Sequence, residues 1–380
     1  MRSTLVIVLL VAVVGTIGTA VFLYNRSNFQ EQTWDRYHMA TAMFDSGDYE
    51  NALKELAPVI EAGRSFEGAE EAYLLLARTQ EKKGSNDYLV TWQRFLQEFP
   101  KSERVEEIKL KIADSLLDQD VAKARSIYEE LSNSTNQQVK DLAMLGTIKT
   151  MDKEGNTAKA RELYYEIIES STSPEVIARA KDRLSEINSE VLWSPEIDEF
   201  GQIYVVERGD SPIVIASKFK TTAWYISEAN GITGNIHPGK RLKVPKEPLY
   251  VVVDKTQCRL DLLTESGRFV KWYPVGVGEQ SWKTPAGEYK IINKEINPVW
   301  FKPGGGKILP DNPENALGTR WMGIGNSLGI HGTNAPETIG FRKSAGCIRM
   351  HNQDVEELYK LITYGSRVVI KEGTGTIDAS

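Results

Sequence analysis

The 380-residue sequence has few cysteines and histidines and no excess of basic residues. It contains two cysteines and four histidines, and neither a CxxC nor an HxxxH spacing occurs, so we expect no metal site and no cofactor. The net charge of −6 argues against nucleic acid as a partner, because no basic surplus exists to neutralise phosphates. Apolar residues make up 41%, which is ordinary for globular proteins, and the length allows two or three domains.

Charged residues are also missing from residues 4–24. An uncharged, largely apolar stretch of this length can cross a bilayer as one helix, whereas the apolar core of a secretory signal is usually shorter. Cleavage after Ala20 stays open, because Gly18 and Ala20 are both small. We expect residues 1–30 to form a signal anchor with a transmembrane helix.

Residues 31–190 show apolar residues at helical spacing between turn markers. Four helix–turn–helix units recur with a period near 36 residues; their markers are Gly47-Asp48-Tyr49, Gly84 to Tyr88, Gln119-Asp120 and Gly155-Asn156. The period resembles that of degenerate tetratricopeptide repeats, which implies an all-α solenoid whose concave side binds a partner. Two interpretations stay open: a scaffold for another envelope protein, or a spacer.

The composition changes after residue 190, and residues 203–246 follow a compact βααβ pattern. Strand-like residues 204–206 precede a turn and a helix start at 209–212, and a second short helix ends at Asn230-Gly231. The order Tyr-x-Val, Gly-Asp-Ser, Asn-Gly and Pro-Gly-x-x-Leu-x-Val-Pro resembles a LysM domain.

This resemblance implies binding of glycan strands that contain N-acetylglucosamine, through the two loops beside the helices. The residues it points to are Gly209, Asp210, Ser211, Pro212, Gly231, Ile232, Thr233 and Gly234. The alternative is a linker module without glycan affinity.

Residues 249–371 predict an all-β domain, a sandwich or a barrel. Short runs rich in β-branched and aromatic residues lie between glycines, at 249–254, 259–264, 269–275, 287–292 and 367–371. Only residues 353–362 have a helical period, and Asn352 is the expected cap.

A cysteine and a histidine near the end of this domain suggest nucleophilic catalysis. Cys347 follows Ser344, Ala345 and Gly346, and His331 lies sixteen positions earlier. A thiol is a useful nucleophile only as thiolate, and an imidazole can take its proton. The small residues before Cys347 allow a close approach of the substrate, so the N–H groups of Gly346 and Cys347 are candidates to bind an oxyanion.

The strings at 331–333 (His-Gly-Thr) and 344–350 (Ser-Ala-Gly-Cys-Ile-Arg-Met) resemble the signature of the L,D-transpeptidases of the YkuD type. The resemblance implies a β-sandwich, with Cys347 as nucleophile, His331 as its base and Arg349 shaping the substrate site. Ser344, Gly346, Gly332 and Thr333 fall within the same motif.

A second landmark of the family is Lys283-Thr284-Pro285-x-Gly287. The family frequently has histidine where this sequence has Ala345; that residue is not the base.

Three further groups near this motif need an interpretation. The long segment 297–329 is expected to be a lid or cleft wall, with Trp300 and Trp321 contacting the stem peptide or closing the sandwich. His351 competes with His331 as base, although a surface residue before a helix is the preferred interpretation. Cys258 lies on an apolar face and is expected to be a buried thiol; a disulfide with Cys347 would block the nucleophile.

Together these features predict a membrane-anchored, extracytoplasmic bacterial enzyme that acts on peptidoglycan stem peptides and binds glycan strands. The expected reaction forms a Cys347 thioester with a tetrapeptide stem, releases D-alanine and transfers the acyl group to an amine, giving 3-3 crosslinks or protein attachment. The resemblance also implies acylation by carbapenems. Two alternatives remain: an L,D-carboxypeptidase or crosslink hydrolase that uses the same cysteine, and a non-catalytic wall-binding scaffold.

Overall fold

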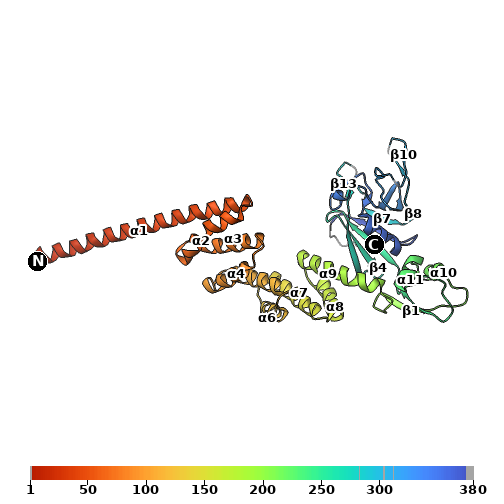
Figure 1. The fold of residues 1–380 in the computed structure, drawn as a ribbon, viewed down its shortest axis with the longest axis horizontal. Helices are drawn as coiled ribbons and strands as arrows, with labels where there is room; N and C mark the ends of the chain where they lie inside the picture. The colour runs from red at the N-terminus through yellow and green to blue at the C-terminus, as the bar shows by residue number, and fades with distance from the viewer. Residues whose placement is uncertain (1, 282, 303, 311, 374–380) are drawn as a thin grey trace. The chain divides into compact units, whose positions relative to one another are not determined.

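The computed structural model describes residues 2–281, 283–302, 304–310 and 312–373, with side chains described from residue 23 onward. The chain divides into two compact units, residues 1–160 and 161–380. The first unit is helical, and the second contains the last helices of the predicted helical region, a small βααβ module and a β domain (Figure 1).

Consecutive helices pack against one another in the first unit. They are α1 (Arg2–Asp45), α2 (Tyr49–Glu61), α3 (Ala69–Lys82), α4 (Asp87–Glu98), α5 (Val105–Leu116), α6 (Val121–Leu131) and α7 (Gln137–Lys153). Gly47, Gly84 and Gly155 have positive φ angles at the turns, as the sequence predicts. The helical character of the region is confirmed, and its assignment to tetratricopeptide repeats stays a prediction.

Helix α1 continues through the apolar residues 4–24. The side chains of residues 1–22, which make up most of the predicted membrane anchor, lie outside the described part of the chain. Within the described part, the structure contains no helix that is both long and apolar enough to span a bilayer.

The second unit begins inside α8 (Thr157–Ser170) and includes α9 (Pro174–Trp193), which packs on strand β5 (Phe269–Pro274). The Tyr165 hydroxyl donates to the Phe269 carbonyl at 2.7 Å. The Asn188 amide donates to the Tyr165 hydroxyl and to the carbonyl of the residue after Phe269, both at 2.8 Å. The sequence places the end of the helical region at 190, whereas the structure assigns its last two helices to the unit that holds the β domain.

The small module has the predicted βααβ order. Strand β1 (Gly201–Val205) pairs antiparallel with β2 (Arg241–Pro245), and α10 (Pro212–Lys218) and α11 (Ala223–Ala229) lie between them in sequence. Lys243 of β2 is buried and its ammonium donates to the carbonyls of Val191 and Ser194 and to the Asp198 carboxylate at 2.6, 3.0 and 2.5 Å. These contacts attach the module to the end of α9.

A five-stranded mixed sheet forms one layer of the β domain, in the order β5-β4-β3-β15-β7. Its other strands are β3 (Leu249–Asp254), β4 (Arg259–Thr264), β7 (Gly287–Lys290) and β15 (Arg367–Lys371), all within one or two residues of the predicted runs. Strand β3 is central and fully paired, which agrees with its continuous run of β-branched residues.

A four-stranded sheet, in the order β14-β12-β11-β8, carries the cysteine motif. Its strands are β8 (Asn293–Ile296), β11 (Arg320–Gly325), β12 (Leu328–His331) and β14 (Ile348–Arg349); β6 (Val277–Gly278) pairs with β13 (Arg342–Ser344) beside it. The expected lid at 297–329 is therefore only partly a loop. Its end forms β11 and the start of β12, while β9 (Trp300–Phe301) and β10 (Lys307–Ile308) form a small hairpin.

Helix α12 (Asn352–Leu361) is the predicted helix, and its cap differs from the expectation. His351 occupies the N-cap position without a side-chain cap bond. The Asn352 amide instead binds two other segments, as described below.

Candidate active site

Strands β12 and β14 bring the segments that carry the two predicted catalytic residues side by side. They pair in parallel, with Ile330 opposite Ile348 and His331 opposite Arg349. Arg349 is therefore on the sheet face that carries His331, and Cys347 directly precedes β14. The Cys347 sulfur lies 3.7 Å from the Ser327 carbonyl oxygen and also interacts with the Gly329 N–H, at the other end of β12.

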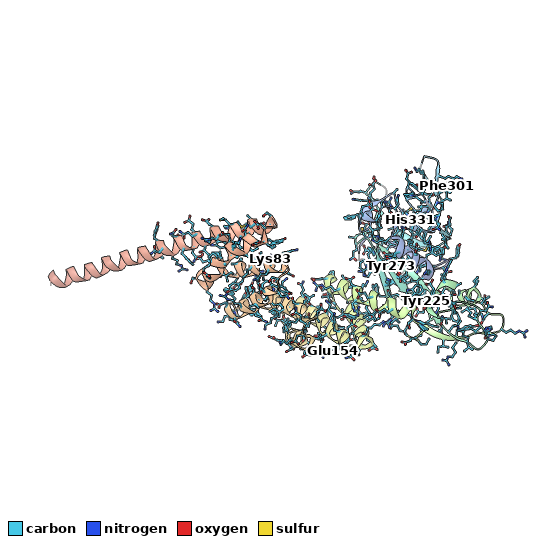
Figure 2. All side chains as sticks on the ribbon, in the orientation of Figure 1. Lys83, Glu154, Tyr225, Tyr273, Phe301 and His331 are labelled. Atoms are coloured by element: carbon cyan, nitrogen blue, oxygen red, sulfur yellow. The ribbon has the colours of Figure 1, made fainter. Side chains whose placement is uncertain are left out.

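His331 is buried, with 3% of its surface exposed (Figure 2). Its Nδ1 lies 2.6 Å from the Gly332 carbonyl oxygen. Burial lowers the pKa of His331 to about 4. The Gly332 and Leu317 carbonyls act to raise this pKa, and the Arg349 charge lowers it further, but each of these effects is smaller than that of burial. The ring is therefore a neutral base at pH 7.

Burial also raises the pKa of the Cys347 thiol above its ordinary value. The Gly329 N–H and the Arg349 charge act in the opposite direction and are outweighed. The resting pair at neutral pH is thus a thiol and a neutral imidazole. The sequence predicts that Cys347 becomes reactive by transferring its proton to a histidine. The raised pKa agrees with a thiol in the resting state and not with a permanently ionised thiolate.

A tight turn presents Cys347, and Ser344 holds this turn closed. The buried Ser344 hydroxyl donates to the Cys347 carbonyl at 2.6 Å and accepts the Gly346 N–H at 3.2 Å. Gly346 has φ +109°, a conformation that strongly favours glycine. Of the two N–H groups predicted to bind an oxyanion, that of Gly346 already has a partner. The Cys347 N–H has no backbone partner among the described residues.

Arg349 is half-buried beside this pair. Its backbone exchanges two hydrogen bonds with Gly276, at 2.8 and 2.9 Å. Its guanidinium makes no ion pair with any described residue, and its charge acts on both His331 and Cys347.

Gly332 and Thr333 are buried behind His331 and are held by Asn352, a residue that sequence reasoning assigned to a helix cap. The Asn352 Oδ1 accepts the N–H groups of Thr319 and Thr333 at 3.3 and 3.2 Å, and its Nδ2 donates to the Thr333 carbonyl at 3.1 Å. A Cβ on Gly332 would lie 2.1 Å from the same oxygen, which explains the glycine. No sequence signal distinguishes this asparagine from an ordinary cap.

The two predicted tryptophans have different positions. Trp321 of β11 stacks on His331, with ring centroids 5.6 Å apart and an angle of 25° between planes. Its ring also covers Gly329, where a Cβ would lie 2.6 Å away. Trp300 belongs to the β9–β10 hairpin, whose exposed Phe301 lies at the outer end of the domain (Figure 2). Trp321 is thus part of the site, and no contact places Trp300 there.

Cys258 and His351 are the other cysteine and histidine of the β domain. Cys258 is a free, buried thiol, and Cys347 is also free, so the disulfide alternative is wrong. Cys258 lies in the turn before β4 with φ +49°, and burial raises its pKa. His351 lies at the start of α12, near Asp354. Among the described residues, no cluster of three or more potential metal ligands occurs.

Most of the residues predicted to bind glycan in the small module also stabilise its loops. The Asp210 carboxylate accepts the Tyr204 hydroxyl at 2.6 Å, the Glu207 N–H and the Lys218 ammonium, which lowers its pKa to about 2. Ser211 caps α10, Pro212 is its first residue, and Gly209 and Gly231 have positive φ angles. Ile232 is half-buried, and Thr233 and Gly234 are exposed.

Comparison with known proteins identifies both modules. The family model of the L,D-transpeptidase catalytic domain (YkuD) matches residues 248–370, and that of the LysM domain matches residues 204–245. YkuD of Bacillus licheniformis is 36% identical over 176 residues, covering 44% of this chain and 98% of that protein. YkuD of Bacillus subtilis is 33% identical over 174 residues, covering 44% and 97%. The catalytic-domain structure of an Enterococcus faecium L,D-transpeptidase covers 33% of this chain and 98% of that chain, with 24% identity and a TM-score of 0.28.

The fold and the site thus define an acyltransferase domain with a wall-binding module. The chain belongs to the YkuD-type L,D-transpeptidases. The family resemblance predicted from the two motifs is confirmed.

Proposed function

We propose that the protein is a peptidoglycan L,D-transpeptidase that uses Cys347 as nucleophile and His331 as base. One observation supports this proposal: the parallel pairing of β12, which ends at His331, with β14, which directly follows Cys347, brings the two segments side by side. The Cys347 N–H, which has no backbone partner among the described residues, supplies a donor for the oxyanion.

The reaction begins at the carbonyl that joins the third residue of a tetrapeptide stem to its terminal D-alanine. The Cys347 proton passes to His331, the sulfur bonds to the carbonyl carbon, and the carbonyl electrons move to oxygen. When the tetrahedral intermediate collapses, the C–N bond breaks and the proton passes from His331 to the departing amine of D-alanine. An acceptor amine then attacks the thioester, loses a proton to His331, and Cys347 leaves as the thiol.

The test is a digest of muropeptides with the wild-type chain, Cys347→Ala and Cys258→Ala, analysed by mass. We expect 3-3 linked dimers with the wild type and with Cys258→Ala, because that buried thiol is outside the site. Cys347→Ala should form no dimers and no covalent carbapenem adduct. Retained activity in Cys347→Ala would contradict the proposal.

The same digest distinguishes the alternatives. Tripeptides without dimers would identify a carboxypeptidase, since water then resolves the thioester. An unchanged digest with the wild type would leave a wall-binding scaffold. Attachment of stems to an added envelope protein would identify a protein amine as acceptor.

The placement of the enzyme at the membrane is part of the proposal. The uncharged residues 4–24 support an anchor, and the peptidoglycan substrate requires the catalytic domain to lie outside the cytoplasm. We also propose that the helices of the first unit act as tetratricopeptide-like repeats that bind an envelope protein. Membrane fractionation, and co-purification with and without this unit, are the corresponding measurements.

A further inference from the structure

Thr284 is a buried polar residue to which the mechanism so far gives no role. It belongs to the Lys-Thr-Pro landmark of the sequence and has 1% of its surface exposed. Its hydroxyl oxygen accepts the Gly278 N–H at 2.8 Å, and the hydroxyl donates to the Gly346 carbonyl at 2.8 Å. Its own carbonyl accepts the buried Lys255 ammonium at 3.0 Å. The hydroxyl is therefore fixed from both sides.

The Gly346 carbonyl shares a peptide plane with the Cys347 N–H. The chain has no cis peptide among the described residues, so this carbonyl and this N–H point in opposite directions. A hydrogen bond that fixes the carbonyl consequently fixes the N–H. Glycine is conformationally permissive, so without that bond the plane next to Gly346 is easily rotated.

The Cys347 N–H, like the Ala345 N–H, has no backbone partner among the described residues, and it is the one that belongs to the nucleophile. The Gly346 N–H donates to Ser344, and the Ser344 hydroxyl donates to the Cys347 carbonyl. A hydrogen-bond donor stabilises a transition state best when it already points to the position where the negative charge will develop, because the protein then needs no reorganisation during the reaction.

We propose that Thr284 is a positioning residue, which holds the Gly346–Cys347 peptide so that the Cys347 N–H faces the oxyanion of the reaction. This inference rests on the proposed function. It assigns to Thr284 an effect on the tetrahedral intermediate and none on the sulfur itself.

Two reactions of Cys347 separate these effects. Acylation by a carbapenem passes through an oxyanion: sulfur bonds to the lactam carbonyl carbon, the C–N bond breaks, and the proton goes to the ring nitrogen. Alkylation by iodoacetamide displaces iodide at a saturated carbon and has no oxyanion. Both rates are measured on the full chain carrying Cys258→Ala, so that Cys347 is the one thiol.

Thr284→Val keeps the shape of the side chain and removes the hydroxyl. We expect acylation to slow by about 100-fold, the usual effect of losing one oxyanion donor, and alkylation to change by less than about threefold. Thr284→Ser should retain most of the acylation rate. The matched control is Thr264→Val, which removes a buried hydroxyl from β4 in the same domain and should leave both rates unchanged.

Equal losses in the two reactions, or no loss in either, would overturn the positioning role. If Thr284→Val does not fold, as judged by thermal unfolding, the acylation ratio of Thr284→Ser to Thr284→Ala provides the same comparison, and a ratio near one would overturn the role. A wild-type chain that alkylates but is never acylated would instead refute the proposed function.

Discussion

At the scale of single residues, burial determines the charge of both candidate catalytic groups. His331 and Cys347 are each desolvated, so the neutral form of each is favoured. Under the proposed function, proton transfer between them creates two charges at the moment of reaction. The charge of Arg349 and the Gly329 N–H, which already act to lower the pKa of Cys347, then stabilise the thiolate.

The lowered pKa of His331 links folding to pH. In the folded chain it is about 4, below the ordinary 6.5, so the unfolded state binds the proton more readily. This contribution to stability is complete above pH 6.5 and is lost as the pH falls through 4. The difference of 2.5 pH units corresponds to about 3 kcal/mol.

Urea unfolding at pH 7 and pH 4.5 tests this link. His331→Gln has no titrating ring, so its loss of stability between the two pH values should be smaller than that of the wild type by about 2 kcal/mol. The carboxylates titrate equally in the wild type and in His331→Gln, so their contributions to the change in stability cancel in the comparison. An equal loss in the two chains would show that the histidine is not buried as described.

The family was predictable, because its two motifs are short strings of fixed residue type and spacing. The catalytic roles of Cys347 and His331 stay predictions. The role of Asn352 was not predictable, because an asparagine before a helical run reads as a cap and its three hydrogen bonds go to segments 19 and 33 positions away.

At the scale of elements, strand β12 depends on its glycine. Gly329 lies beneath the ring of Trp321, which in turn stacks on His331. The sequence placed Trp321 in the long segment 297–329, whereas the structure forms strand β11 there, with an irregular register between Gly323 and Gly325. Strands β3, β4 and β15, without such interruptions, were predicted with their exact ends.

Gly329→Ala tests the packing of this element. The added Cβ would lie 2.6 Å from the indole and must displace it, and with it the support of His331. We expect a loss of stability of about 1–3 kcal/mol and a fall in carbapenem acylation of at least about tenfold. Tryptophan fluorescence should report the displaced ring.

The matched control is Gly234→Ala in the LysM module, where nothing lies within 4 Å of the added atom. It should leave acylation unchanged. Wild-type acylation by Gly329→Ala would mean that the position of Trp321 does not matter for the base.

At the scale of the whole molecule, the boundary within the helical region differs from the sequence expectation. Helix α9 buries Val176, Ala180, Leu184 and Ile187, a spacing that equally fits a repeat packed on its neighbour. Periodicity reports that a face is apolar and does not report what covers it. Here strand β5 covers the apolar face of α9, and an ion pair between Lys181 and Asp261 at 2.8 Å lies beside this contact.

Two deletions test this boundary. Removing residues 31–160 should leave the thermal unfolding of the catalytic unit unchanged. Removing residues 31–190 should lower the melting temperature of the catalytic unit by at least about 5 °C. This deletion removes α8 and α9, and with them the side chains that donate hydrogen bonds to two carbonyls of β5. Identical melting temperatures for the two deletions would restore a boundary near 190.

Several contacts fix the LysM module to helices α9 and α12. Lys243 joins the module to the end of α9, and Lys360 of α12 pairs with Glu228 of α11 at 2.8 Å. Trp193, the last residue of α9, donates to Glu357 of α12 at 3.1 Å. Under the proposed function, the glycan-binding module and the catalytic domain are therefore held at a set separation, so the point where the module binds a glycan strand limits which stem peptides can reach Cys347.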